Sequence, residues 1–268
     1  MFLPGGLTAA EIRAKIPGMD EAEPDINQLF APLVPADAFG VVLSEAQEVL
    51  RHVREPIDAE LWGSDMIGAL SRSAEGESAE TQDLVTALVP AAEAAATPES
   101  LALLRIFAAI GAPGLRAAAA EAADRVAALG VSEQPWVADL GLPHVSDCWH
   151  YGDVGGRQES VTVSFAYGEK THALSVLIDH GRGGAIKDVW IGDAAGLLDK
   201  TFLAAEADPL IVFETLDPAE AHRRLEQAIG AGEHPDKPDQ RDDITAHRAL
   251  LYARMSLLAV ESAINSDD

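Results

Sequence analysis

The alternation of hydrophobic and polar positions in residues 160–193 predicts the central strands of an antiparallel sheet. In residues 161–165, apolar residues alternate with small polar ones, which is the pattern of a half-buried strand. Residues 174–178 are apolar on both faces, as in a central strand, and residues 186–191 follow a turn that contains three glycines. Because a parallel crossover needs about a dozen residues or more, these short connections predict three consecutive antiparallel strands.

Weaker patterns extend this sheet and add helices to it. Residues 148–151 and 210–213 are expected as further strands. Asp193 and Asp217 stand where N-caps would begin two helices. Residues 244–264 carry the apolar stripe of a final amphipathic helix.

The first half of the chain has helical rather than strand-like periodicity. Capping boxes at residues 8–11 and 44–47 are expected to begin two helices, and a further helix is expected over residues 58–70. Residues 80–130 predict three consecutive helices, with Thr97 as an N-cap. The short loops are typical of a helical-repeat array, but no residue pattern recurs, so the sequence favours an irregular bundle.

Proline, glycine and small polar residues mark the expected boundaries. Residues 17–37 and 71–79 are predicted to be loops, and residues 131–146 are predicted to be a rigid linker. The fold class that follows is α+β. A helical bundle over residues 1–130 is followed by a small antiparallel sheet packed with helices over residues 147–268.

Composition narrows the classes of function. The 268 residues carry a formal net charge of −25, with 8 basic and 20 acidic residues in 1–130 and 11 and 24 in 131–268, so the charge is not confined to a tail. Such a field disfavours binding to nucleic acid or to anionic membranes. No apolar run is long enough for a transmembrane helix, and no signal peptide is recognised. The single cysteine, Cys148, cannot form an internal disulfide, which favours a reducing cytoplasm.

Three runs within residues 99–200 have a distinctive character: LALLRIFAAIG, PWVADLG and HALSVLIDHGRGGAIKD. They are similar to sequences in uncharacterised proteins common in GC-rich actinobacteria. The resemblance covers a little over a third of the chain. It implies no activity, so it contributes no site residue.

His144, Cys148 and His150 form the candidate metal cluster, with Asp147 and Asp153 beside them. Cys148 and His150 would share one face of a strand, as two metal ligands could. The set lacks a recognised zinc spacing, however, and a buried cysteine commonly acts as a small hydrophobic residue. We therefore predict that no transition metal binds here.

Asp179, His180, Lys187 and Asp188 form the candidate catalytic cluster around the glycine turn. An aspartate can orient a histidine and raise its basicity, as a general base requires. Adjacent residues on a strand point to opposite faces, however, so the turn would have to bring Asp179 and His180 together. A structural alternative is that one of them caps free amides of the turn while Lys187 pairs with an acid. The glycines lead into a strand without Lys-Ser/Thr, which excludes a phosphate-binding P-loop.

These observations favour a non-catalytic cytoplasmic binding or scaffolding protein that acts through contacts with another protein and uses no cofactor. The hypothesis depends on the lack of recognised enzyme motifs, the helical first half and the dispersed negative charge. The alternative is a hydrolase-like enzyme with a site at the 179–188 loop.

Overall fold

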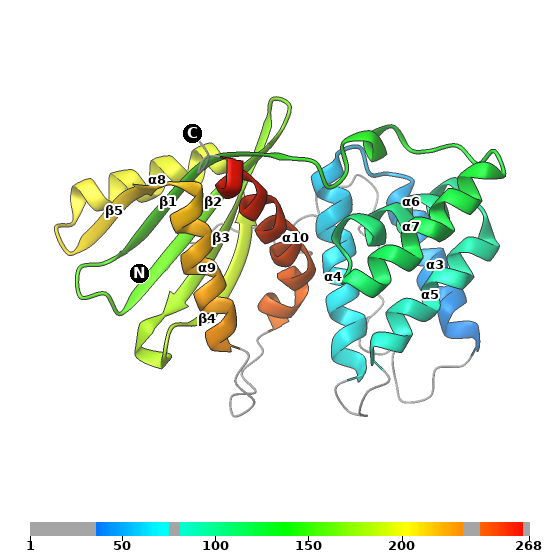
Figure 1. The fold of residues 1–268 in the computed structure, drawn as a ribbon, viewed down its shortest axis with the longest axis horizontal. Coiled ribbons are helices and arrows are strands. Elements are labelled where there is room, and N and C mark those ends of the chain that lie inside the picture. Colours follow the sequence, from blue (N-terminus) through cyan, green and yellow to red (C-terminus); the bar gives the residue numbers. More distant parts are fainter. Residues whose placement is uncertain (1–35, 75–80, 233–241, 265–268) are drawn as a thin grey trace. The chain divides into compact units, whose positions relative to one another are not determined.

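The structure is a computed structural model that describes residues 36–74, 81–232 and 242–264 (Figure 1). The chain divides into two compact units, each of which is described by itself. The helical unit ends at Gly141 and includes Thr245–Ala253, and the sheet unit comprises Leu142–Ile244 with the described residues from Arg254 onward. The predicted helix at residues 8–11 lies outside the described residues.

The helical unit consists of α-helices joined by short connections. They are α3 (Ala36–Leu50), α4 (Pro56–Ala74), α5 (Thr81–Ala95), α6 (Pro98–Ile110), α7 (Pro113–Ala128) and the 3-10 helix η1 (Pro135–Asp139). The three helices predicted over residues 80–130 are thus confirmed as α5, α6 and α7.

Helix α6 begins at the predicted cap and forms the core of this unit. Thr97 Oγ1 accepts a hydrogen bond from the Ser100 amide at 3.1 Å, and Ser100 Oγ accepts one from the Thr97 amide at 2.8 Å. The helix is buried on nearly every side, with its apolar residues inaccessible to solvent: Leu101, Leu103, Leu104, Ile106, Phe107 and Ile110. A helix that is apolar all round must be enclosed by its neighbours.

Several predicted boundaries in the first half are wrong. Helix α3 begins at Ala36 rather than at Ser44, so the predicted loop over residues 17–37 overlaps its start. Ser44 lies within the helix, where its hydroxyl donates to the Gly40 carbonyl at 2.8 Å. The reason is that buried Val42 extends the apolar stripe of Ala46, Val49 and Leu50 upstream of Ser44. Helix α4 is likewise longer than residues 58–70 at both ends, and Ala74 lies in the expected loop 71–79.

The sheet unit confirms the predicted α+β fold class. Its elements are β1 (His144–Asp153), β2 (Gln158–Tyr167), β3 (Lys170–Asp179), the 3-10 turn η2 (His180–Arg182), β4 (Ala185–Gly192), α8 (Ala194–Ala207), β5 (Ile211–Leu216) and α9 (Pro218–Gly232). The last helix, α10 (Asp242–Ile264), is divided between the units, because Thr245–Ala253 belongs to the helical unit and the rest to the sheet unit. The strands of the described part form one sheet in the order β4-β3-β2-β1-β5. Every neighbouring pair is antiparallel, which confirms the three consecutive antiparallel strands predicted in residues 160–193.

The turn between β3 and β4 uses its glycines as the sequence indicates. Gly183 and Gly184 have φ values of 82° and 78°, in the left-handed region that favours glycine. The Gly184 amide donates to the Asp179 backbone carbonyl at 3.0 Å. Lys187 is the extra residue of a β-bulge in β4. The residues on either side of it, Asp188 and Ile186, pair with the consecutive residues Leu177 and Ile178 of β3.

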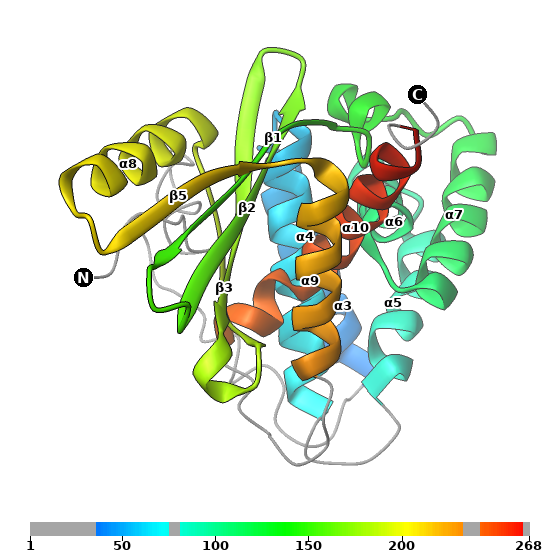
Figure 2. The same ribbon diagram turned by 60° about the vertical axis from the view of Figure 1, so that its left-hand side comes forward.

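Helices α8 and α9 cover opposite faces of the sheet (Figure 2). Trp149 and Ala173 pack with α8 through Ala194, Leu197 and Leu198. The other face presents buried valines to α9, whose inner residues are Ala221, Leu225 and Ala228. Asp193 and Asp217 cap the two helices as predicted, accepting from the Gly196 amide at 2.6 Å and from the Glu220 amide at 2.7 Å.

Candidate functional site

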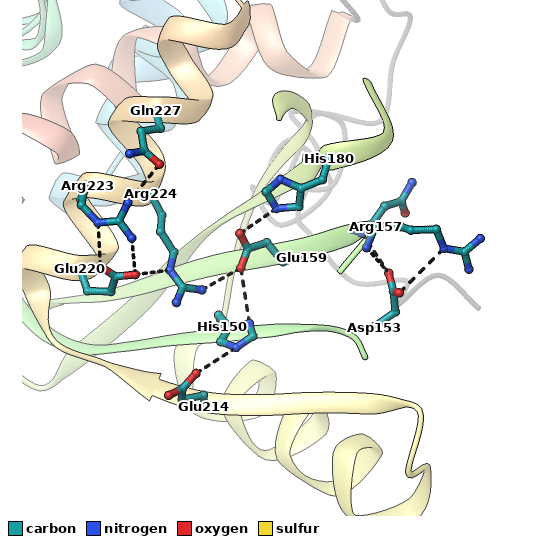
Figure 3. A network of polar contacts seen from close by, with 11 residues as sticks. His150, Asp153, Arg157, Glu159, His180, Glu214, Glu220, Arg223, Arg224 and Gln227 are labelled. Carbon is teal, nitrogen blue, oxygen red and sulfur yellow. Dashed lines mark hydrogen bonds and ion pairs between the residues drawn. The ribbon is translucent and has the colours of Figure 1, made fainter. Parts of the chain in front are cut away.

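Ionisable side chains from several elements meet on the α9 face of the sheet around Glu159 (Figure 3). Glu159 lies on β2, His150 on β1, His180 in η2 and Arg224 on α9. The register pairs His150 with Val161, two residues from Glu159 along β2, so both side chains point to the same face. We call this set, with Glu214 and Glu220, the Glu159 network.

Both carboxylate oxygens of Glu159 have partners. His180 Nε2 lies 3.0 Å from Oε1, and Arg224 Nη1 donates to Oε2 at 2.9 Å. His150 Nδ1 lies 3.5 Å from the same Oε2, and His150 Nε2 lies 3.3 Å from Glu214 Oε2. The His150 ring is therefore held between two carboxylates, from β2 and from β5.

Arg224 extends the network along α9. Its Nε donates to Glu220 Oε1 at 2.6 Å, and Arg223 donates to both oxygens of Glu220 at 2.6 and 2.8 Å. These hydrogen bonds, from Arg223 and then from Arg224, lower the pKa of Glu220 to about 2. Since Glu220 lies one turn before Arg223 and Arg224, the helix itself pre-arranges this triad.

The network is only partly open to solvent. The side chains of Glu159 and His150 are 15% and 13% exposed, whereas His180 is 44% exposed. Partly buried charges are stable only when they are paired and hydrogen-bonded, as the Glu159 carboxylate is by His180 and Arg224, whereas the buried Nδ1 of His150 has no hydrogen-bond partner among the described residues. The clearest consequence of the network is structural, because it joins β1, β2, β5, η2 and α9. The accessible ring of His180, oriented by Glu159, is the part with potential for acid–base chemistry.

The predicted catalytic cluster is not assembled as a pair of Asp179 and His180. Asp179 Oδ2 accepts from Gln158 Nε2 at 3.2 Å, while His180 contacts Glu159, the next residue along β2. Since adjacent strand residues point to opposite faces, the two side chains are directed to opposite sides of the sheet. The Asp179 side chain makes no capping hydrogen bond to the turn, so the part of the structural alternative that gave this role to Asp179 is wrong.

Lys187 and Asp188 occupy the bulge of β4. Lys187 is the extra residue of that bulge, and Asp188 pairs with Leu177. Asp188 Oδ1 accepts from the amide of its neighbour Val189 at 2.9 Å. Asp188 thus pairs with a residue of β3 in the strand register, whereas the register passes over Lys187.

The candidate metal residues lie along β1 but have different surroundings. His144 is exposed at the start of the strand, and His150 belongs to the Glu159 network. Cys148 is buried, and burial, with the charges of Asp147 and Asp217, raises its pKa to about 12. Among the described residues, no group of three His, Cys, Asp or Glu side chains could hold a metal ion.

Sequence reasoning missed Glu159 as the centre of the network. A signal was present, because Glu159 precedes Val161, Val163 and Phe165 at a spacing of two residues. A carboxylate on an otherwise apolar strand face needs a partner, but that partner, Arg224, lies 65 positions further along the chain.

A second feature lies near β5, which ends the sheet among the described strands and beside which large apolar side chains are exposed. Val154, Phe202, Leu203 and Leu210 are 56%, 46%, 61% and 65% exposed, and we call them the β5 edge patch. The Val154 amide donates to the Leu210 carbonyl at 3.0 Å, and the Phe202 ring packs edge-on against Phe213 with centroids 5.6 Å apart. Figure 2 shows α8, which carries Phe202 and Leu203, lying alongside β5.

Acidic residues border the β5 edge patch. They are Asp199 and Glu206 on α8, Asp208 in the α8–β5 turn and Glu214 on β5, with Lys200 as a nearby base. The pKa of Tyr151, which pairs with Phe213, is raised by burial and by the charge of Asp208. The charge of Asp208 therefore acts on the strand next to β5.

Comparisons of the chain with protein-family models, with curated proteins and with solved structures find no match. Within the described ranges, no helix is both long enough and apolar enough to cross a membrane.

Proposed function

We propose that the protein is a non-catalytic cytoplasmic binding or scaffolding protein that acts through contacts with another protein. The observation that carries this proposal is the β5 edge patch, in which four large apolar side chains remain exposed beside one strand. Clustered exposure of this kind is characteristic of interaction surfaces, whereas single exposed apolar residues are ordinary.

The acidic border selects the kind of partner. Its four carboxylates, in a chain of net charge −25, attract a segment that combines apolar side chains with lysine or arginine. A second copy of this chain would bring like charges together, which disfavours self-association, and nucleic acid is disfavoured for the same reason.

The apolar contribution can be bounded from the exposed fractions. Fully burying a leucine stabilises by about 1.5–3 kcal/mol, so covering Leu203 and Leu210, which are 61% and 65% exposed, would contribute roughly 1–2 kcal/mol each. Together with Phe202 and Val154, covering the patch would contribute roughly 4–7 kcal/mol, which is less than the roughly 8 kcal/mol of a micromolar complex, so polar contacts with the partner must add to the affinity.

The proposal is tested with a display library of random peptides long enough to span β5. The parent protein should select sequences rich in valine, isoleucine, leucine or phenylalanine that also carry lysine or arginine. Leu203→Asp and Leu210→Asp should each lose this selection. Leu129→Asp is the matched control, because Leu129 is 73% exposed in the helical unit. A library with no enriched sequence, or one selected equally by Leu203→Asp and Leu210→Asp, would refute the proposal.

A second candidate function, a hydrolase-like enzyme at the 179–188 loop, is favoured by one observation. His180 is 44% exposed, and its Nε2 lies 3.0 Å from Glu159 Oε1, an orientation that a general base could use. A panel of aryl esters and aryl phosphates tests it. Turnover that His180→Ala abolishes without changing the melting temperature would support the enzyme, and a parent protein without turnover would count against it.

A further inference from the structure

We infer that β5 receives an extended segment of the basic partner as an additional strand of the sheet. This inference depends on the proposed function, since it specifies how the partner binds at the β5 edge patch. Among the strands that the structure describes, β5 pairs with β1 on one side and ends the sheet on the other. Strand addition at such an edge supplies affinity through backbone hydrogen bonds.

The register shows which backbone groups point to the open edge. The hydrogen bond from the Val154 amide to the Leu210 carbonyl makes these residues a hydrogen-bonded antiparallel pair. Hydrogen-bonded and non-hydrogen-bonded pairs alternate, and the pairing of β1 with β5 has no register shift. Tyr151 with Phe213 and Trp149 with Thr215 are therefore the non-hydrogen-bonded pairs. The amides and carbonyls of Phe213 and Thr215 thus point away from β1, toward an incoming strand.

The two edges of the sheet are protected to different degrees. Natural edge strands are guarded by bulges, prolines or charged residues, which discourage pairing with other chains. The β4 edge has such a bulge, at Lys187, and α9 packs against β4. In contrast, β5 has the sequence IVFETL, without proline, lysine or a bulge, and its one charged residue, Glu214, contacts His150 on the α9 face. The β5 edge is thus the one built to accept a strand.

The alternation of an added strand accounts for the chemistry of the surface around it. Side chains on one face of that strand would lie beside Phe213 and Phe202, where apolar residues fit. Those on the other face would lie beside Glu214, where lysine or arginine fits. Two β5 strands pairing with each other would instead bring Glu214 and the acidic border of each copy together, which costs free energy.

The experiment uses the full chain and a synthetic peptide in which valine and lysine alternate. Thr215→Pro removes only an outward amide, a position at which proline is tolerated in edge strands, and Thr215→Ala is the matched control that keeps the amide. Thr215→Ala should bind the peptide like the parent. Thr215→Pro should bind at least about tenfold more weakly, through the lost hydrogen bond and the bulk of its ring. Hydrogen exchange at the Phe213 and Thr215 amides should slow when the peptide binds.

A second probe does not depend on the folding of Thr215→Pro. The same peptide, N-methylated at alternate residues, should fail to bind the parent protein when the methylated amides are those that face β5. Undiminished binding of both N-methylated registers would overturn strand addition.

The outcomes separate this inference from the proposed function. If Leu203→Asp and Leu210→Asp abolish peptide binding while Thr215→Pro does not, the docking surface stands and strand addition is wrong. If no peptide binds the parent, both are wrong. If the parent sediments as a dimer that Thr215→Pro dissociates, the occupant is a second copy and the basic partner is overturned.

Discussion

Mild acid should destabilise the sheet unit through His172. This residue is buried on β3, at 6% exposure, and its ring stacks between Phe165 and Tyr167 with centroids 5.6 and 5.9 Å apart. Arg254 Nη2 lies 3.3 Å from His172 Nε2, so that nitrogen accepts the hydrogen bond and the ring is neutral. Burial, and then the charge of Arg254, lower the pKa of His172 from 6.5 to about 3.

The size of the effect follows from proton linkage. The unfolded chain binds a proton at His172 below a pKa of 6.5, whereas the folded chain does not until about 3. The stabilisation that neutral His172 contributes is therefore fully present above the unfolded-state pKa of 6.5. It is lost as the pH falls toward the folded-state pKa of about 3. Between about pH 8 and about pH 5, the free energy of unfolding should fall by roughly 2 kcal/mol on this account alone.

Urea unfolding at the two pH values measures this difference. Fluorescence of Trp149, which is 1% exposed in the sheet unit, follows the relevant transition, and transitions of the two units are fitted separately. His172→Gln keeps an acceptor for Arg254 but cannot titrate, so it should lose about 2 kcal/mol of the pH dependence. Ile178→Val, on the same face of β3, should cost about 0.5–1.5 kcal/mol at both pH values and keep that dependence. Equal pH dependence in the parent and His172→Gln would refute the reasoning.

Three further predictions concern the turn, α9 and the cysteine. Gly183→Val should destabilise the protein by about 1–3 kcal/mol, because φ at Gly183 is 82°. His180→Ala should barely change the melting temperature. A Gly183→Val variant that melts at the temperature of the parent would contradict this prediction. The pKa of Glu220 is lowered from 4.5 to about 2, so the stabilisation by its carboxylate is present above pH 4.5 and should be lost as the pH falls toward 2. Glu220→Gln should remove this part of the dependence of stability on acid. Cys148, with a pKa of about 12, should react with thiol reagents at neutral pH only after unfolding. Elemental analysis should find far less zinc than protein. A stoichiometric metal that is lost in Cys148→Ser would show that Cys148 binds a metal.

The elements that were predicted well are those with strong local patterns. The alternation in residues 161–165 and the glycines after His180 are short-range features, and they indicate β2 and the β3–β4 turn. Asp193 and Asp217 cap α8 and α9 because a cap depends only on the next three residues.

Local patterns were misleading where packing extended an element beyond its signal. Ser44 has the sequence of a cap, yet α3 runs through it, because burial of Val42 and Ala46 outweighs the preference of serine for a helix end. Asp179 and His180 are neighbours in sequence, and their contacts go to opposite faces of β3.

The sequence by itself determined the α+β class, the antiparallel core strands and the helix starts at Thr97, Asp193 and Asp217. The tertiary structure alone decided that Glu159 joins His180 and Arg224, and that β5 pairs with β1 and is the last described strand on that side of the sheet. The physical reason is one of range. Caps, turns and alternation are interactions between residues a few positions apart, whereas the order and register of strands result from the packing of distant segments, which no local pattern specifies.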